Sequence, residues 1–280
     1  MTTPLALDAG PSTRGRIQDS PYKWKPEKFG FNKDVPGKHP AGQGMEGIGN
    51  EPDYTVSQQE GTLFVRKATG LHKAVEGEQL PPGTAIFVRD SSRMEVKATT
   101  GEILRAGSGT NITISPGRKL ELYKGAILLS IPPSVAGITV TSPLSEVWID
   151  GEGALMLGVT EVGGLKAIGL HGELSLLLPK QNRRKSLPPG KLLFVYTEGQ
   201  GFSRKVDVEL ATVMQTASLI RDFKDPLPFL EDMAKHAKKQ NRKIRSRFRA
   251  LVGDAKSDKD FELMIIRDEE GETPDKEKED

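Results

Sequence analysis

Short apolar runs separated by turn residues fill the middle of the chain, from Gly61 to Val195. They recur about every 8–12 residues, the spacing typical of sandwiches and barrels. Many alternate between apolar and polar positions, as in Leu174, Leu176 and Leu178, which places one side of a strand in a core and the other in water. The pattern predicts a mainly β domain, a sandwich or roll of about twelve short strands, over residues 59–200.

The runs expected to be strands are GTLFVR, TAIFVR, RMEVKA, NITI, KLELY, AILLS, GITVT, SEVWI, ALMLGV, LKAIGL, ELSLLL and KLLFVY. Turn sequences such as AGSGT, SPG and DGEG separate them. The phrase Leu-Pro-Pro-Gly occurs twice, at 80–83 and 187–190, each time before an apolar run. Proline fixes φ and lacks an N–H, and glycine supplies a left-handed corner, so each copy is expected to stop one strand and start the next.

After Gly201 the apolar period changes from two residues to nearly four. A DPLP break at 225–228 divides this region, and Pro228 suits the start of a new helix. The pattern predicts an αα-hairpin over 201–253 that packs against the sheet, followed by an acidic tail at 254–280. The first apolar stripe comprises Val206, Leu210, Val213, Ala217 and Ile220, and the second comprises Leu230, Met233, Ala237, Ile244, Phe248 and Leu251.

Residues 1–58 contain seven prolines, eight glycines and few aliphatic side chains. Such a segment cannot bury enough apolar surface to offset its ordering entropy, so it is predicted to be a disordered or extended arm. Within it, the stretch YKWKPEKFGF holds four aromatics that are candidates for partner binding: Tyr22, Trp24, Phe29 and Phe31. The alternative interpretation is that these side chains pack back on the chain's own domain.

Charge and composition narrow the classes of function. The net charge of the 280 residues is +2, which gives no global field toward nucleic acid or membrane, and the absence of cysteine excludes disulfides and thiolate metal sites. No stretch approaches the roughly 18–20 apolar residues of a membrane helix. The first residues, MTTPLALDAGPSTRG, do not have the form of a signal peptide, so we expect either a cytoplasmic protein or one whose numbering begins after processing.

The sequence contains no recognisable catalytic or metal-binding constellation. The four histidines (His39, His72, His171 and His236) lack ligand spacing, and His171 is expected in a turn between strands. GSGT (107–110) and GEG (151–153) are expected to be hairpin turns, which also accounts for Asp150 and Glu152 without a carboxylate-pair role. We therefore predict no catalytic residue, no cofactor, no metal and no small-molecule substrate.

The second predicted helix is strongly basic. A run of basic residues that no acidic residue interrupts indicates a binding site for anionic lipid, polysaccharide, nucleic acid or an acidic protein surface. The alternative is pairing with the chain's own tail, which carries eight carboxylates after Arg267. The basic run comprises Lys235, Lys238, Lys239, Arg242, Lys243, Arg245, Arg247 and Arg249, the first six being candidates for partner binding. Arg183, Arg184 and Lys185 are expected to form a solvated turn.

The order of signals between Gly61 and Val195 resembles the FecR domain family. The matching phrases are GTLFVRKATGLHKAVEGEQLPPGTAIFV, SRMEVKATTGEILRAGSGTNITI, KLELYKGAILLSI, ITVTSPLSEVWIDGEGALMLGV and AIGLHGELSLLLP with the second LPPG. The resemblance covers about half of the chain. It implies a β-rich, non-catalytic module of the cell envelope, a family best known from a transmembrane signal-relay protein that controls a sigma factor.

From these observations we predict a non-enzymatic interaction or scaffold module that docks to a larger protein assembly or to further copies of itself. The resemblance places it in the cell envelope or periplasm, or outside the cell, with the cytoplasm as the alternative. A different hypothesis is a polyanion-binding protein that uses the basic second helix. The two hypotheses predict different effects of salt. Polyanion binding weakens steeply as the salt concentration rises, whereas docking through aromatic side chains and strand edges does not.

Overall fold

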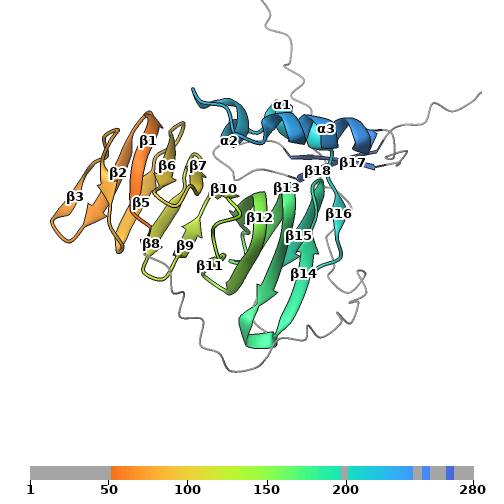
Figure 1. The fold of residues 1–280 in the computed structure, drawn as a ribbon, viewed down its shortest axis with the longest axis horizontal. Helices are drawn as coiled ribbons and strands as arrows, with labels where there is room; N and C mark the ends of the chain where they lie inside the picture. The colour runs from red at the N-terminus through yellow and green to blue at the C-terminus, as the bar shows by residue number, and fades with distance from the viewer. Residues whose placement is uncertain (1–51, 197–200, 242–247, 253–262, 268–280) are drawn as a thin grey trace, which may run out of the picture. The chain divides into compact units, whose positions relative to one another are not determined.

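The structure, a computed structural model, describes residues 52–196, 201–241, 248–252 and 263–267, all of which belong to one compact unit, Asn32–Asp280. Most of these residues form strands, and the α-helices follow the strands of the main sheet in the chain (Figure 1). This confirms the predicted fold class. The predicted aromatic arm lies outside the described residues.

The strands of the main sheet are short apart from two. In chain order they are β1 (Tyr54–Glu60), β2 (Leu63–Lys67), β3 (Gly70–Lys73), β4 (Gln79–Leu80), β5 (Thr84–Val88), β6 (Arg93–Ala98), β7 (Ile103–Ala106), β8 (Asn111–Ser115), β9 (Lys119–Lys124), β10 (Ala126–Ile131), β11 (Ile138–Ser142), β12 (Ser145–Val159), β13 (Leu165–Leu178), β14 (Arg183–Leu187), β15 (Lys191–Val195) and β16 (Val206–Asp207). A 3-10 turn, η2 (Pro179–Gln181), connects β13 to β14.

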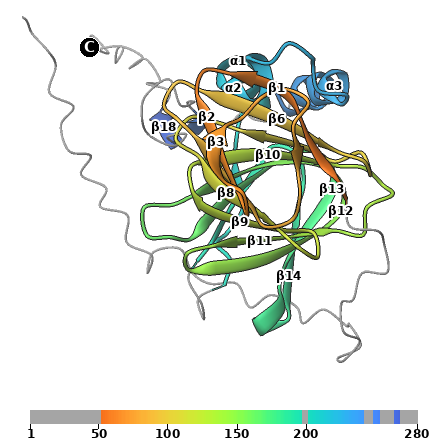
Figure 2. The ribbon, with the colours of Figure 1, turned by 90° about the vertical axis from the view of Figure 1, so that its left-hand side faces the viewer.

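The main sheet curls into a roll (Figure 2). Its hydrogen-bonding order is β3-β2-β5-β8-β9-β11-β12-β10-β7-β6-β1-β4, and β13 joins β12 and carries β14, β15 and, through β15, β16. Neighbouring strands pair antiparallel except β9 and β11, which are parallel. One connecting segment bonds to both β1 and β2, because Val56 N–H donates to Glu78 C=O (2.9 Å) and Ala74 N–H donates to Leu63 C=O (3.0 Å). This segment holds together the two ends of the strand order.

The first strand begins earlier than predicted. Residues 54–58, assigned to the arm by the sequence pattern, lie in β1 and alternate between buried and half-buried positions. The polar inward residue Gln58 hides this alternation in the sequence, since it is buried through hydrogen bonds to Glu95 and Asp225. Burial raises the pKa of Tyr54 at the start of the strand.

The inner core consists of the inward positions of the curled strands. The predicted alternation is confirmed by the burial of Met94, Val96, Ala98, Ile112, Ile114, Leu120, Leu122, Leu174, Leu176 and Leu178. These side chains belong to one continuous apolar cluster that reaches from Tyr54 to Phe202. The hydrophobic effect across this cluster is therefore the main force that keeps the sheet curled.

Both Leu-Pro-Pro-Gly phrases form the predicted turns. Thr84 N–H donates to Pro81 C=O (3.1 Å) before β5, and Lys191 N–H donates to Pro188 C=O (3.2 Å) before β15. The glycine before each donor has a positive φ (88° at Gly83, 73° at Gly190), the geometry of a type II turn with proline at its second position. The two copies are thus one turn used twice.

The two longest strands, β12 and β13, bend instead of ending at their glycines. β12 pairs with β11 through Ser145–Ile149 and with β10 through Gly153–Gly158. The prediction of a hairpin turn at GEG is wrong, and so is that of a turn at His171, which lies within β13. At the bend the two backbones approach so closely that a Cβ on Gly153 would lie 2.2 Å from His171 C=O. GSGT connects β7 to β8, which are not paired, so it is not a hairpin turn either.

Three helices cover the outer face of the sheet: α1 (Leu210–Thr216), α2 (Ser218–Arg221) and α3 (Leu230–Asn241). They bury Val213, Ile220 and Met233 against outward residues of β10, β12, β13 and β15, including Leu128 and Met156. The first predicted helix is divided at Ala217, whose backbone is extended, and Val206 lies in β16. Thr216 Oγ1 donates to Thr212 C=O (2.8 Å), a contact that competes with regular helix geometry next to the break.

The second predicted helix is also shorter than expected. α3 ends at Asn241, whereas Phe248 and Leu251 lie in strand β17 (Phe248–Val252), paired with β18 (Leu263–Arg267). The second strand falls within the range predicted as tail. FRALV and LMIIR are short apolar runs whose backbones pair in a two-stranded ladder, so the prediction that Phe248 and Leu251 lie on a helix is wrong. Ile244 lies outside the described residues.

A buried ion pair connects the sheet to the helical segment. Arg105 on β7 is fully buried, and its Nε donates to Glu95 Oε2 on β6 (2.8 Å). Its Nη1 donates to the carbonyls of Leu219 (3.1 Å) and Ile220 (3.2 Å), and its Nη2 donates to Asp225 C=O (2.6 Å). Burial lowers the pKa of Arg105, and Glu95 acts in the opposite direction. One guanidinium therefore serves α2 carbonyls that the short helix leaves without partners.

We expect Arg105→Met to lower the free energy of unfolding by about 3–5 kcal/mol, because Glu95 would lose its buried partner and keep only the longer, more exposed contact with Lys97 (3.5 Å). Urea unfolding followed by circular dichroism measures this loss. The matched control is Arg93→Met, which breaks the more exposed pair with Glu60 and should cost only about 0–1 kcal/mol. A loss below about 1 kcal/mol for the Arg105 variant would contradict the central role of this pair.

The bend in β12 supplies another prediction. Gly153 and Gly77 both have positive φ, but a Cβ on Gly77 would meet nothing within 4 Å. Gly77→Ala should therefore cost only the conformational strain, about 1–2 kcal/mol. Gly153→Ala should cost about 1–3 kcal/mol more, because its Cβ collides with backbone that cannot move away. Equal midpoints in urea for the two variants would show that the bend tolerates a side chain.

Candidate interaction surface

Two identical tripeptides form an aromatic and cationic surface on the outer side of the roll. Phe-Val-Arg occurs at 64–66 in β2 and at 87–89 at the end of β5. The strands are antiparallel neighbours, and their register places Phe64 directly opposite Phe87. Because Val65 and Val88 are buried in the core, the phenylalanines and arginines of both copies point to the other side. We call Phe64, Arg66, Phe87 and Arg89 the FVR face.

The arrangement has an approximate local twofold symmetry. Each arginine follows its own phenylalanine by two residues, and the strands run in opposite directions, so the arginines lie at opposite ends of the aromatic pair. The guanidinium carbon of Arg66 lies 5.3 Å from the centroid of the Phe87 ring, which is a cation–π contact. The two rings are half-buried and both arginines are exposed.

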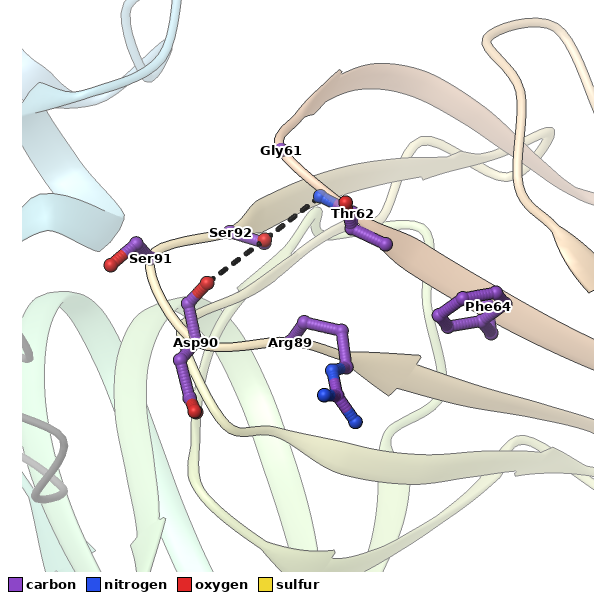
Figure 3. Close-up of a pocket in the computed structure, with 7 residues that line it drawn as sticks. All are labelled: Gly61, Thr62, Phe64, Arg89, Asp90, Ser91 and Ser92. Atoms are coloured by element: carbon purple, nitrogen blue, oxygen red, sulfur yellow. Dashed lines mark hydrogen bonds between the residues drawn. The ribbon is translucent and has the colours of Figure 1, made fainter.

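A shallow hollow of about 720 Å³ adjoins Phe64 and Arg89. Thr62, Phe64 and Arg89 line it on one side and the turn Asp90–Ser92 forms another wall (Figure 3). The wall is held by the Ser92 hydroxyl, which accepts from Thr62 N–H (2.9 Å) and donates to Asp90 C=O (3.2 Å). The backbone of Arg89 is fixed as well, since its N–H donates to Thr62 C=O (3.1 Å). Hydrogen bonds to the backbone therefore fix the position of the residues that line the hollow.

Neighbouring strands extend the same surface. Lys73 on β3 lies opposite Phe64, and Asn111 on β8 lies opposite Phe87. Lys124 follows opposite Asn111 on β9, so one outward row reads Lys73, Phe64, Phe87, Asn111, Lys124. The helices pack elsewhere, on β10, β12, β13 and β15 (Figure 1). The described helices therefore leave this row uncovered, with aromatic side chains at its centre and cations at its ends.

Polar groups of the hollow are engaged in backbone contacts. The hydroxyl of Ser92 is engaged by backbone groups on both sides, and no imidazole lines the hollow. Among the described residues no group of three or more histidines or carboxylates is placed to hold a metal ion. No helix in the described part of the chain is long and apolar enough to cross a membrane.

The structure places only some of the residues predicted from the sequence. Lys235, Lys238 and Lys239 are exposed on α3, where Lys235 pairs with Asp232 (2.7 Å). Their partner-binding role stays a prediction, since none of them lines the FVR face. Seven further candidates lie outside the described residues: Tyr22, Trp24, Phe29, Phe31, Arg242, Lys243 and Arg245.

Sequence reasoning missed the FVR face although its signal was present. GTLFVR and TAIFVR were predicted as strands, and both are. What the prediction lacked was the pairing of these two strands, which are separated by β3 and β4 in the chain. Without the register between β2 and β5, the repeated tripeptide indicates only that each of the two strands is amphipathic.

Comparisons with known proteins found few similarities. No protein-family model matches the chain, and no curated protein does. Two crystal structures of a "putative anti-sigma factor" from Parabacteroides distasonis, at 2.50 and 1.65 Å resolution, each show 13% identity and a TM-score of 0.37. In both cases 65% of this chain and 98% of the other chain are covered. A TM-score this low carries no argument about function, and the FecR resemblance stays a prediction.

We expect the FVR face to contribute little to folding. Phe87→Ala should lower the free energy of unfolding by about 0.5–1.5 kcal/mol, the worth of an aromatic cross-strand pair on a half-exposed surface. The neighbouring Ile86→Ala, which removes a fully buried side chain, should cost about 2–5 kcal/mol. Comparable losses in urea unfolding for the two variants would show that Phe87 is a core residue.

Proposed function

We propose that this protein is a non-enzymatic interaction module that docks to a larger protein assembly through the FVR face. One observation carries the proposal: a pair of phenylalanines, flanked by two exposed arginines, lies on a sheet face that the helices leave uncovered. Aromatic residues and arginine are enriched at the centres of protein interfaces, because they bury large areas with few rotatable bonds.

The face also defines the chemistry of its partner. The phenylalanine pair requires apolar side chains at the centre, and the arginines at either end require carboxylates. Arg66 is already oriented by stacking on Phe87, so little side-chain entropy is lost when it pairs with an anion. The partner in this proposal is a protein segment with apolar residues between two acidic ones.

The location in the cell envelope remains part of the proposal and is supported by the FecR resemblance alone. The alternative function, polyanion binding by the basic helix, receives less support. Within the described part of α3, three lysines accompany Glu231 and Asp232, and Lys235 pairs with Asp232. An i,i+3 pair of this kind is typical of a solvated helix face.

Site-specific photo-crosslinking tests the proposal. Ala85 lies opposite Arg66 on the same outward side, so a photoreactive amino acid at this position samples whatever covers the face. In cells that naturally make the protein, we expect a discrete cross-linked protein that is lost in the double variant Arg66→Glu, Arg89→Glu. Charge reversal should abolish capture, because like charges across an interface repel strongly.

The double variant Lys238→Glu, Lys239→Glu is the matched control, since it makes the same change in charge on α3. It should leave the cross-link intact. If the control variant loses the cross-link and the Arg66/Arg89 variant keeps it, the docking surface is the helix and the proposal fails. Absence of any protein cross-link from Ala85 contradicts it as well.

A further inference from the structure

The strands next to the FVR face carry a second set of groups on the same outward side of the sheet. β2, β5, β8 and β9 lie side by side (Figure 1), and their register places Arg66, Ala85, Thr113 and Glu121 in one row across them. Tyr123 lies beside the end of this row, because its hydroxyl donates to Glu121 Oε2 (2.6 Å). The row therefore begins with a cation next to aromatic rings and ends with a carboxylate next to another aromatic ring.

The groups at both ends of the row are accessible. Arg66 is exposed and pairs with no carboxylate in the described part of the chain. Tyr123 is 48% exposed, although large aromatic side chains are usually buried unless they serve an interface. The hydrogen bond from Tyr123 lowers the pKa of Glu121, so this carboxyl is ionised at neutral pH. Lys119 Nζ lies 3.3 Å from Glu121, but a surface pair of this kind contributes little and leaves the carboxylate available.

The order of the row is complementary to the same row in a second copy. Two copies packed face to face, and related by a twofold axis parallel to the strands between β5 and β8, have opposite strand orders. This operation places β9 of the second copy over β2, and β8 of the second copy over β5. Glu121 of the second copy then faces Arg66, and Thr113 of the second copy faces Ala85. The two central side chains are small, which allows the sheets to approach.

We propose that the FVR face binds a second copy of this chain, in a dimer in which Arg66 of each copy pairs with Glu121 of the other. The inference rests on the proposed function and identifies the partner. The second copy supplies an aromatic side chain, Tyr123, next to Phe64, and the carboxylate that the Arg66 end of the face requires. Because a twofold axis generates every contact twice, one complementary pair is sufficient for a symmetric interface.

Another basic segment of the sheet is less suited to the same role. Residues 183–185, expected to form a solvated turn, lie in β14 instead. Arg184 Nη1 donates to Asp150 Oδ2 (2.5 Å) and Ser175 Oγ (3.0 Å), and the basic residues on either side of it are also engaged within the chain. Arg66 differs because its contact is the Phe87 ring, which orients the guanidinium and leaves its hydrogen-bond donors for a carboxylate.

The size of the row limits the strength of the dimer. Four strands at a spacing of about 4.8 Å give a contact roughly 15–20 Å wide. Interfaces of this size are at the low end of specific protein contacts, so we expect a dissociation constant of about 10–100 µM. The affinity should fall as salt is added, because the charged side chains at the edge of the contact remain near water.

Sedimentation velocity of the full chain, from about 5 to 500 µM at roughly 50 mM salt, tests the dimer. Arg66→Glu and Glu121→Arg should each weaken self-association at least tenfold, because each places like charges opposite one another. The double variant Arg66→Glu, Glu121→Arg exchanges the two charges and should dimerise within about threefold of the original chain. A monomeric original chain at about 500 µM overturns the proposal, and so does a double variant as weak as either single variant.

A mixture of the two single variants tests the symmetry of the contact. The Arg66→Glu chain has glutamate at both positions and the Glu121→Arg chain has arginine at both, so neither should dimerise alone. Their equimolar mixture should form a one-to-one dimer. The matched controls are Lys238→Glu and Glu231→Arg on α3, which make the same changes in charge at exposed positions. Each control should self-associate like the original chain, and equal weakening in the controls would show a diffuse charge effect and overturn the proposal.

Photo-crosslinking from Ala85 separates this inference from the proposed function. A product of two copies of the chain supports the dimer. A product with a different protein, together with a monomeric chain in sedimentation, overturns the dimer and leaves the proposed function standing. The absence of any cross-linked protein overturns both. Circular dichroism of each variant excludes misfolding as the cause of a lost contact.

Discussion

The buried guanidinium of Arg105 determines which side of the sheet the helices can cover. It is paired with Glu95 inside the sheet, while its other nitrogens reach the carbonyls of Leu219, Ile220 and Asp225. The Phe223 ring lies 4.2 Å from the guanidinium carbon and closes the site. A buried ion pair is weak evidence for stability, because desolvation offsets most of its attraction. Its effect here is specificity, because the remaining donors of Arg105 are satisfied only when α2 and Asp225 lie in this position.

The same pair explains where the sequence misleads. Alternation correctly predicted the inner core because residues such as Val96 and Ile112 obey the period of two. Gln58 on β1 and Arg105 on β7 are buried polar residues that are compensated in part by segments distant in the chain, namely α2 and Asp225. The start of β1 and the junction with α2 depend on those long-range bonds, so they could not be predicted from local patterns.

The glycines of β12 show a second limit of sequence reasoning. Asp-Gly-Glu-Gly has the composition of a turn, and the tendency of glycine to adopt positive φ is real in the structure. The chain nevertheless continues as one strand, because Gly151 and Gly153 face the backbone of β13 at a distance that excludes a side chain. The positive φ of these glycines was predictable from the sequence. Whether they bend the strand or reverse the chain in a hairpin depended on the partner strand β13.

The FVR face arises from strand pairing, because two copies of one tripeptide meet in antiparallel register. The sequence contained the residue types but not their juxtaposition. The helices occupy the outer face of β10, β12, β13 and β15, so a partner on β2 and β5 does not have to displace them.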